Sequence, residues 1–195
     1  VIAWLYAIGS VLSVISDPGF RRLRAYQRTV GRIQAHKQPF WIVCGYGGAG
    51  NQVIRFMDQS GIRSVMIESN QTRADTAKLS DMTYDLDVLV GDASEPQTLV
   101  DAGVQSALCR GVLALTDHNQ TNLTIATNTR ILAPRVLVHA RSESDANTRN
   151  LRSFNTDVVI DPARVAARSL TQLIRKPRAF ALYHELVDPD FNPVS

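Results

Sequence analysis

The sequence predicts an α/β protein with a Rossmann-type, doubly wound parallel sheet of six strands. Three observations support this prediction. From Phe40 onward, six short apolar segments rich in β-branched residues alternate with helical patterns, as in a parallel sheet buried on both faces. A glycine-rich turn from Gly45 to Gly50 follows the first segment and opens a helix. An acid, Glu68, ends the second segment, 18 residues beyond Gly50.

The glycine-rich turn has the spacing G-x-G-x-x-G that is typical of dinucleotide-binding folds. Gly45 allows a tight turn, Gly47 allows a pyrophosphate to approach the backbone, and Gly50 allows the following helix to pack closely. The start of that helix offers free N–H groups and a positive dipole end to phosphates. Glu68 can accept both hydroxyls of an adenosine ribose. The pattern predicts a nucleotide site; the alternative is a doubly wound domain whose site is empty or degenerate.

The chain before the sheet divides into an apolar segment, residues 1–16, and a basic segment, residues 17–38, with a net charge of +5. Sixteen residues are fewer than the roughly 20 that cross a bilayer, so we expect 1–16 to be the end of a truncated membrane helix. Asp17-Pro18-Gly19 predicts a break, and residues 20–35 predict a basic amphipathic helix in a linker on the cytoplasmic side. The alternative is a solvated helix packed on its own domain.

Composition restricts the class of protein. The chain has 195 residues, 45% of them hydrophobic and 20% charged, which is ordinary for a globular protein. Its net charge of +3 comes from residues 17–38, because residues 39–195 carry −2, so we expect no nucleic-acid-binding surface. The two cysteines, Cys44 and Cys109, suggest no disulfide framework, and Cys44 is expected to be a buried thiol.

The remaining elements follow in chain order, each from an apolar run or a capping pattern. The expected strands are 40–44, 64–67, 87–90, 111–116, 136–140 and 157–160. Six helices are expected, each named by the residues that start it. The first follows the glycine turn, the second has Asn70 as its N-cap and spans 71–82, and the third starts with a capping box of Ser94 and Gln97. The fourth starts with Asp117 and Gln120 and ends at Leu132, the fifth starts with Ser142 and Asp145 and ends at Arg152, and the last starts at Asp161-Pro162.

Ligands of parallel sheets bind beyond the carboxyl ends of the strands. The polar residues at those ends therefore form one candidate constellation with the glycine turn: Glu68, Asp92, Thr116 with Asp117, and Arg141. Each has a structural alternative, because Asp92 could cap a turn, Asp117 could cap its helix, and Arg141 could form a surface salt bridge. An arginine fork would suit a pyrophosphate.

These residues resemble the RCK N-terminal domain, also called TrkA-N or KTN, a family that regulates potassium channels and transporters. The likeness covers residues 39–175. Its specific motifs are Gly91-Asp92-Ala93 after the third strand and Leu115-Thr116-Asp117, followed by Asn122, after the fourth. Val43 to Gly50, Glu68 and Val138 to Arg141 complete it.

The resemblance implies a cytoplasmic, non-enzymatic module that binds an adenine nucleotide, NAD(H) or ATP/ADP, and gates cation transport. It implies phosphate contacts from the turn and Arg141, a ribose contact from Glu68, and an adenine region at Asp92 and Ala93. The full set of implied ligand-binding residues is Gly45, Tyr46, Gly47, Gly48, Ala49, Gly50, Glu68, Asp92, Ala93, Thr116, Asp117 and Arg141. No catalytic residue and no metal ligand is expected.

The resemblance also implies homo-oligomers, in which dimers build a tetrameric or octameric ring below a potassium-channel pore. The helix after Pro162 would cross over to the dimer partner. The sequence departs from a complete channel, because residues 1–195 contain no selectivity filter and residues 176–195 form only a tail or the start of a C-terminal part.

Two other functions remain open on the sequence. An NAD-dependent oxidoreductase would need a substrate domain and a positioned acid or base, and the four histidines show no triad or metal spacing. A soluble regulatory subunit of a potassium uptake transporter would have residues 1–16 packed against another protein instead of lipid. Because Glu68 would repel a 2′-phosphate, NADP is disfavoured; the sequence does not choose between NAD(H) and ATP/ADP.

Overall fold

The structure of the chain, a computed structural model, describes residues 18–176. The expected membrane helix at 1–16 and the tail after Lys176 lie outside the described residues. Within residues 18–176, none of the helices combines the length and the apolar character that crossing a membrane requires.

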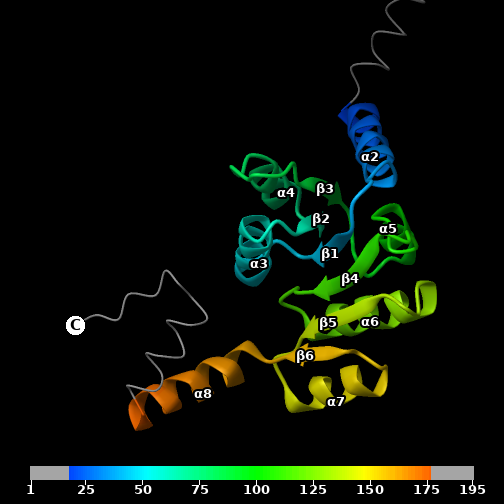
Figure 1. The fold of residues 1–195 in the computed structure, drawn as a ribbon. Coiled ribbons are helices and arrows are strands. Elements are labelled where there is room, and N and C mark those ends of the chain that lie inside the picture. Colours follow the sequence, from blue (N-terminus) through cyan, green and yellow to red (C-terminus); the bar gives the residue numbers. More distant parts are fainter. Residues whose placement is uncertain (1–17, 177–195) are drawn as a thin grey trace, which may run out of the picture.

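The centre of the fold is the predicted six-stranded parallel sheet, in the order β3-β2-β1-β4-β5-β6 (Figure 1). Because β2 and β4 flank β1, the connections reverse direction there, and this switch point is where ligands bind in such sheets. The strands are β1 (Phe40–Cys44), β2 (Arg63–Glu68), β3 (Asp87–Val90), β4 (Cys109–Ala114), β5 (Leu137–Arg141) and β6 (Val158–Ile160).

Helices cover both faces of the sheet, which confirms the doubly wound prediction. On one face, Val43, Met66 and Val88 pack with Ile54 and Met57 of the helix after the glycine turn. The other face carries the larger core. The helices are α2 (Pro18–Gln34), α3 (Gly48–Gln59), α4 (Gln71–Lys78), α5 (Pro96–Asp101), α6 (Asn119–Leu132), α7 (Asp145–Ser153) and α8 (Pro162–Arg175).

Three of the expected helix starts are wrong in detail. The capping box of Ser94 and Gln97 does not form, because α5 begins after Glu95 and Ser94 bonds to Asp92 instead. The N-cap of α6 is His118, without a side-chain cap bond. The N-cap of α7 is Ser144, whose hydroxyl accepts from the N–H of Asn147 at 3.2 Å. At Ser94 a bond to Asp92, two residues back, takes the place of the expected cap.

The other boundaries shift by a few residues. α4 ends at Lys78 instead of 82, and the fourth strand runs from Cys109 to Ala114 instead of 111–116. Asn70 and Asp161 cap their helices as predicted, accepting from the N–H groups of the third residues beyond them.

Helix α2 packs on the sheet domain through its C-terminal half, so this part of residues 17–38 is more than a linker. Ile33 is buried in the core. Nε of Arg32 lies 3.0 Å from Oδ1 of Asp87, Nε2 of His36 lies 2.8 Å from Oδ2, and the Tyr26 hydroxyl donates to Asp101 at 2.6 Å. These contacts favour the alternative of a helix packed on its own domain. Pro18 and Gly19 occupy its first described turn, where proline is tolerated.

Both cysteines are buried, in agreement with the expectation for Cys44. Burial raises the pKa of both thiols, that of Cys109 to about 12. Because the thiolate is the reactive form, these residues behave as small core side chains at neutral pH.

Helix α8 extends from the β6 edge of the sheet, and none of its residues is buried (Figure 1). Val165, Leu170 and Ile174 expose 55%, 60% and 82% of their surface. An amphipathic helix with an exposed apolar face lacks a packing partner within residues 18–176.

Candidate functional site

A cavity of about 530 Å³ opens at the carboxyl edge of the sheet, where the sequence places the candidate residues. It lies over the switch point between β1 and β4. The cavity brings together nine of the twelve predicted residues: Gly45, Gly47, Gly48, Glu68, Asp92, Ala93, Thr116, Asp117 and Arg141. The other three, Tyr46, Ala49 and Gly50, do not line it.

The glycines of the turn have two different roles: some set the backbone conformation and packing, and others leave the cavity open. Gly45 has φ +99°, a conformation that favours glycine. A Cβ at Gly50 would lie 1.9 Å from the carbonyl oxygen of Gly45, so this glycine sets how closely α3 approaches the end of β1. A Cβ at Gly47 or Gly48 would meet no protein atom within 4 Å. The two cavity-lining glycines therefore leave open space in front of the backbone.

The N-terminus of α3 faces this space without a side-chain cap. Its N-cap residue is Gly47, which has no side chain to donate or accept. The first N–H groups of a helix have no intrahelical acceptor, and here the N-cap residue offers them no side-chain acceptor. The cavity therefore has a positive helix end and free backbone donors at one wall.

Glu68 is buried, with 4% of its surface exposed, and binds the turn. Its Oε2 accepts from the N–H of Tyr46 and its Oε1 from the N–H of Asn70, both at 2.7 Å. A carboxylate has about four acceptor positions, so the two oxygens can still accept further donors from the cavity. Glu68 thus holds the glycine turn against the end of β2 and lines the cavity, where the Ser69 hydroxyl also donates to its Oε1 at 3.5 Å.

Tyr46 acts through the backbone instead of the cavity. Its ring is buried and its hydroxyl lies 3.0 Å from Oγ of Ser80. Asp92 caps a turn, because its Oδ1 accepts from the N–H and the hydroxyl of Ser94 at 2.8 and 2.7 Å. Asp92 therefore both caps a turn, as its structural alternative predicts, and lines the cavity.

A network around Asn122 holds the ends of β4 and β5 together. Asn122 is buried, and its Oδ1 accepts from the N–H and the hydroxyl of Thr116 at 3.0 and 2.7 Å. Its Nδ2 donates to the carbonyls of Thr116 and Arg141 at 3.0 and 3.1 Å. One side chain thus fixes two loops that line the cavity.

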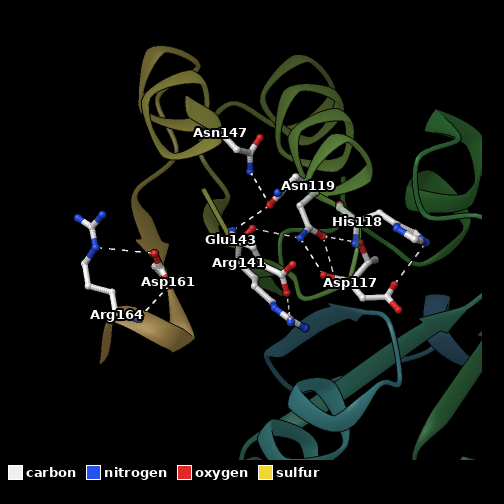
Figure 2. A network of polar contacts seen from close by, with 10 residues as sticks. Asp117, His118, Asn119, Arg141, Glu143, Asn147, Asp161 and Arg164 are labelled. Atoms are coloured by element: carbon white, nitrogen blue, oxygen red, sulfur yellow. Dashed lines mark hydrogen bonds and ion pairs between the residues drawn. The ribbon is translucent and has the colours of Figure 1, made fainter. Parts of the chain in front are cut away.

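The guanidinium of Arg141 forms one ion pair and has one N–H donor that is not used. Its Nη2 pairs with Glu143, and Figure 2 shows the two side chains beside Asp117 and His118. Its Nε is buried and has no hydrogen-bond partner within residues 18–176. A buried unpaired donor is costly, and this one belongs to a side chain that lines the cavity. The surface salt bridge considered for Arg141 forms, but it leaves that donor unused.

Some lining residues were missed by the sequence analysis. Arg73, in the first turn of α4, and Thr121, in the first turn of α6, both line the cavity. Since α4 and α6 begin at the carboxyl edge, the first helical turns after β2 and β4 were the signal that could have found them. His118 also lines it and lies 3.6 Å from Asp117.

We expect Asn122→Asp to lower the free energy of unfolding by about 2 kcal/mol, because both carbonyls lose their donor and face a carboxylate oxygen. Urea unfolding measures this loss. Asn128→Asp, on the same helix, is the matched control, since Asn128 donates only one recorded bond, to the carbonyl of Ser94 at 2.8 Å. Equal losses in the two variants would contradict the role of Asn122 in holding the ends of β4 and β5 together.

Comparison with known proteins agrees with this geometry. Residues 41–162 match the model of the TrkA-N domain. Potassium channel protein 1 of Methanocaldococcus jannaschii is 23% identical over 182 residues, which cover 93% of this chain and 53% of that protein. The present chain thus spans about half of the relative's length.

Two solved structures have a similar fold. The TrkA-N domain of the inner membrane protein ybaL from Escherichia coli superposes with a TM-score of 0.63 at 19% identity, covering 70% of this chain and 96% of that one. The GsuK channel bound to NAD superposes with a TM-score of 0.60 at 25% identity, covering 74% of this chain and 25% of that one.

Proposed function

Because the chain belongs to the TrkA-N domain family, we propose that it is a regulatory module that binds an adenine nucleotide and controls potassium transport. The observation that carries the proposal is the open space in front of the backbone of Gly47 and Gly48, in a cavity that Arg141, with its unpaired Nε, also lines. Free backbone donors, a helix N-terminus and an arginine are the groups that bind phosphates. The similarity to the GsuK channel bound to NAD supports the choice of ligand class.

The cavity residues fit such a ligand from the phosphates to the base. Gly45, Gly47, Gly48 and the start of α3 would hold the phosphates, together with Arg141. Glu68 would accept the ribose hydroxyls through the lone pairs that the N–H groups of Tyr46 and Asn70 leave free. In this proposal Asp92, Ala93, Thr116 and Asp117 line the remainder, while Tyr46, Ala49 and Gly50 shape the turn.

The proposed ligand is NAD(H) or ATP/ADP, and a 2′-phosphate is disfavoured. A ribose 2′-phosphate would approach the buried carboxylate of Glu68, which would repel it. NAD and ATP both present adenosine and a diphosphate to the same wall of the cavity. Titration has to distinguish them.

In the proposed mechanism the nucleotide shifts a population of assembled states. Dimers of this chain, arranged in a tetrameric or octameric ring on the cytoplasmic side of a membrane, would use the exposed apolar face of α8 as partner contact. Residues 1–38 would connect the ring to a potassium-channel pore, with residues 39–175 as the nucleotide domain. The nucleotide regulates transport only if it binds the two states with different affinity.

An oxidoreductase is the weaker candidate. Among the histidines that the structure describes, only His118 lines the cavity, and its partner Asp117 is exposed. His36 binds Asp87 beside α2, and His139 packs 5.3 Å from the ring of Trp41. No arrangement of base, orienting group and substrate pocket emerges from these positions. A soluble subunit of a potassium uptake transporter would use the same nucleotide cavity.

The decisive experiment is calorimetric titration of the full chain with NAD+, NADH, ATP, ADP, AMP and NADP+, with and without Mg2+. We expect saturable binding of at least one of the first five nucleotides and markedly weaker binding of NADP+. If none of these five nucleotides binds, the nucleotide proposal is overturned. Tighter binding of NADP+ than of NAD+ would overturn the role of Glu68.

Glu68 allows a sharper test, because it has both a structural and a ligand-binding part. Glu68→Ala leaves the N–H groups of Tyr46 and Asn70 without their acceptor, so we expect it to destabilise the fold by about 2–4 kcal/mol. Glu68→Gln keeps one acceptor oxygen, and we expect it to weaken nucleotide binding by about tenfold or more with a smaller loss of stability. Calorimetry and urea unfolding measure the two effects.

The matched control is Asp117→Asn, which removes a charge from the same cavity without removing a bond to a backbone N–H. We expect it to change affinity far less than Glu68→Gln. Equal effects of the two substitutions would mean that only the summed charge of the cavity matters.

A further inference from the structure

A second cavity, also about 530 Å³, lies between α2, α4 and the edge strand β3. We call it the α2–α4 cavity. Arg22 and Leu23 of α2, Lys78 of α4, and Val88 and Val90 of β3 line it. It is separate from the nucleotide cavity except for Ser69, which lines both.

The α2–α4 cavity is cationic. Two of its lining residues, Arg22 and Lys78, are basic, and none is acidic. Of the nearby carboxylates, Asp87 is paired with Arg32 and His36, and Asp101 accepts a hydrogen bond from the hydroxyl of Tyr26. Lys78 lies 3.3 Å from Asp75 in an exposed pair, which is worth little and leaves further ammonium donors available.

The rest of the lining combines hydroxyls with apolar side chains. The hydroxyls of Tyr26, Thr29 and Ser69 line it but already donate to Asp101, the carbonyl of Ala25 and Glu68, while Val88 and Val90 supply an apolar wall. Leu23 exposes 55% of its surface beside them. The two cations suit a phosphate, and the apolar wall suits a short hydrocarbon or glycerol unit attached to it.

We propose that the α2–α4 cavity is a second ligand site that binds a phosphate ester with a small apolar body, such as a glycerophosphate group. The group can come from a free metabolite or from the headgroup of an anionic phospholipid. The site is independent of the nucleotide proposal, because apart from Ser69 its residues are not those of the nucleotide cavity.

The test uses the full chain and two probes. The first is glycerol 3-phosphate, followed by calorimetry and by the NMR signals of the Val88 and Val90 methyl groups. The second is sedimentation with vesicles of phosphatidylglycerol and phosphatidylcholine, compared with vesicles of phosphatidylcholine alone. The variant is the pair Arg22→Gln with Lys78→Gln. The matched control is Arg28→Gln with Arg110→Gln, two exposed arginines that do not line the cavity.

We expect the cavity pair to weaken binding at least about tenfold, and the control pair to leave it nearly unchanged, because only the former loses charge-assisted contacts. Shifts of the Val88 and Val90 methyl signals with glycerol 3-phosphate identify a free phosphate ester. If the chain binds only the phosphatidylglycerol vesicles, and Arg22→Gln with Lys78→Gln weakens that binding, the ligand is a phospholipid headgroup. Equal losses in both double variants, or no binding of either probe, overturn the proposal.

Gly47→Val separates this proposal from the nucleotide proposal. If it abolishes binding of glycerol 3-phosphate, that probe occupies the nucleotide cavity and the second site is refuted. If glycerol 3-phosphate binds at Val88 and Val90 while all nucleotides fail, the nucleotide proposal is refuted and the second site stands.

Discussion

Gly47→Val is expected to weaken nucleotide binding roughly a hundredfold or more, a loss of about 3 kcal/mol of binding free energy, while the domain stays folded. A Cβ at Gly47 would meet no protein atom within 4 Å, so a side chain there would begin in open space at the cavity. The backbone of Gly47, at φ −77° and ψ −168°, is in the extended region that any residue adopts. The clash would therefore be with the phosphates and not with the protein.

Calorimetry with the nucleotide that binds the unchanged chain measures the effect, and Gly47→Ala gives a graded comparison with a smaller side chain. Urea unfolding of the same variants checks that the domain is intact, at one fixed protein concentration because oligomers depend on it. An unchanged affinity of Gly47→Val would show that no phosphate approaches this backbone.

The parts of this site that sequence could predict are those set by local backbone chemistry. Gly45, Gly47 and Glu68 follow strands whose apolar runs are unambiguous, and parallel strands bring their carboxyl ends to one edge. Position along the chain then fixes position in space. The same logic placed Asp92 and Arg141 at the cavity without any knowledge of their contacts.

The parts that sequence could not predict depend on partners far along the chain. The resemblance singles out Asn122 as part of a motif, but its bond to the carbonyl of Arg141, 19 residues away, does not follow from any local pattern. The two capping boxes failed for another reason, because other bonds close by in the sequence form instead: Ser94 bonds to Asp92, and the hydroxyl of Thr116 bonds to Asn122. Local capping rules do not say which of several nearby partners a side chain takes.

Helix α2 shows the same limit at the level of domain organisation. Its arginines predict a solvated or membrane-proximal segment, and their charge hides the apolar residues between them. The structure buries Ile33 and anchors Arg32 and His36 on Asp87, 55 and 51 positions away in the chain. The α2–α4 cavity exists only because of this docking, so composition alone could not have indicated it.

A large effect on stability is expected from Gly50→Ala. Its new Cβ would lie 1.9 Å from the carbonyl oxygen of Gly45 and 3.0 Å from its carbonyl carbon. Both atoms belong to the backbone, so no side chain can rotate away, and α3 must move from the end of β1. We expect a loss of about 3 kcal/mol or more in the free energy of unfolding, at the upper end of overpacking effects.

Gly48→Ala is the matched control, because it is the same substitution in the first turn of the same helix and its Cβ would meet no protein atom within 4 Å. Alanine is a better helix former than glycine, so this variant should be neutral or slightly more stable. Urea unfolding gives both values from the shift in midpoint at constant slope. Equal stability of the two variants would mean that α3 does not pack against the glycine turn as closely as the distance of 1.9 Å requires.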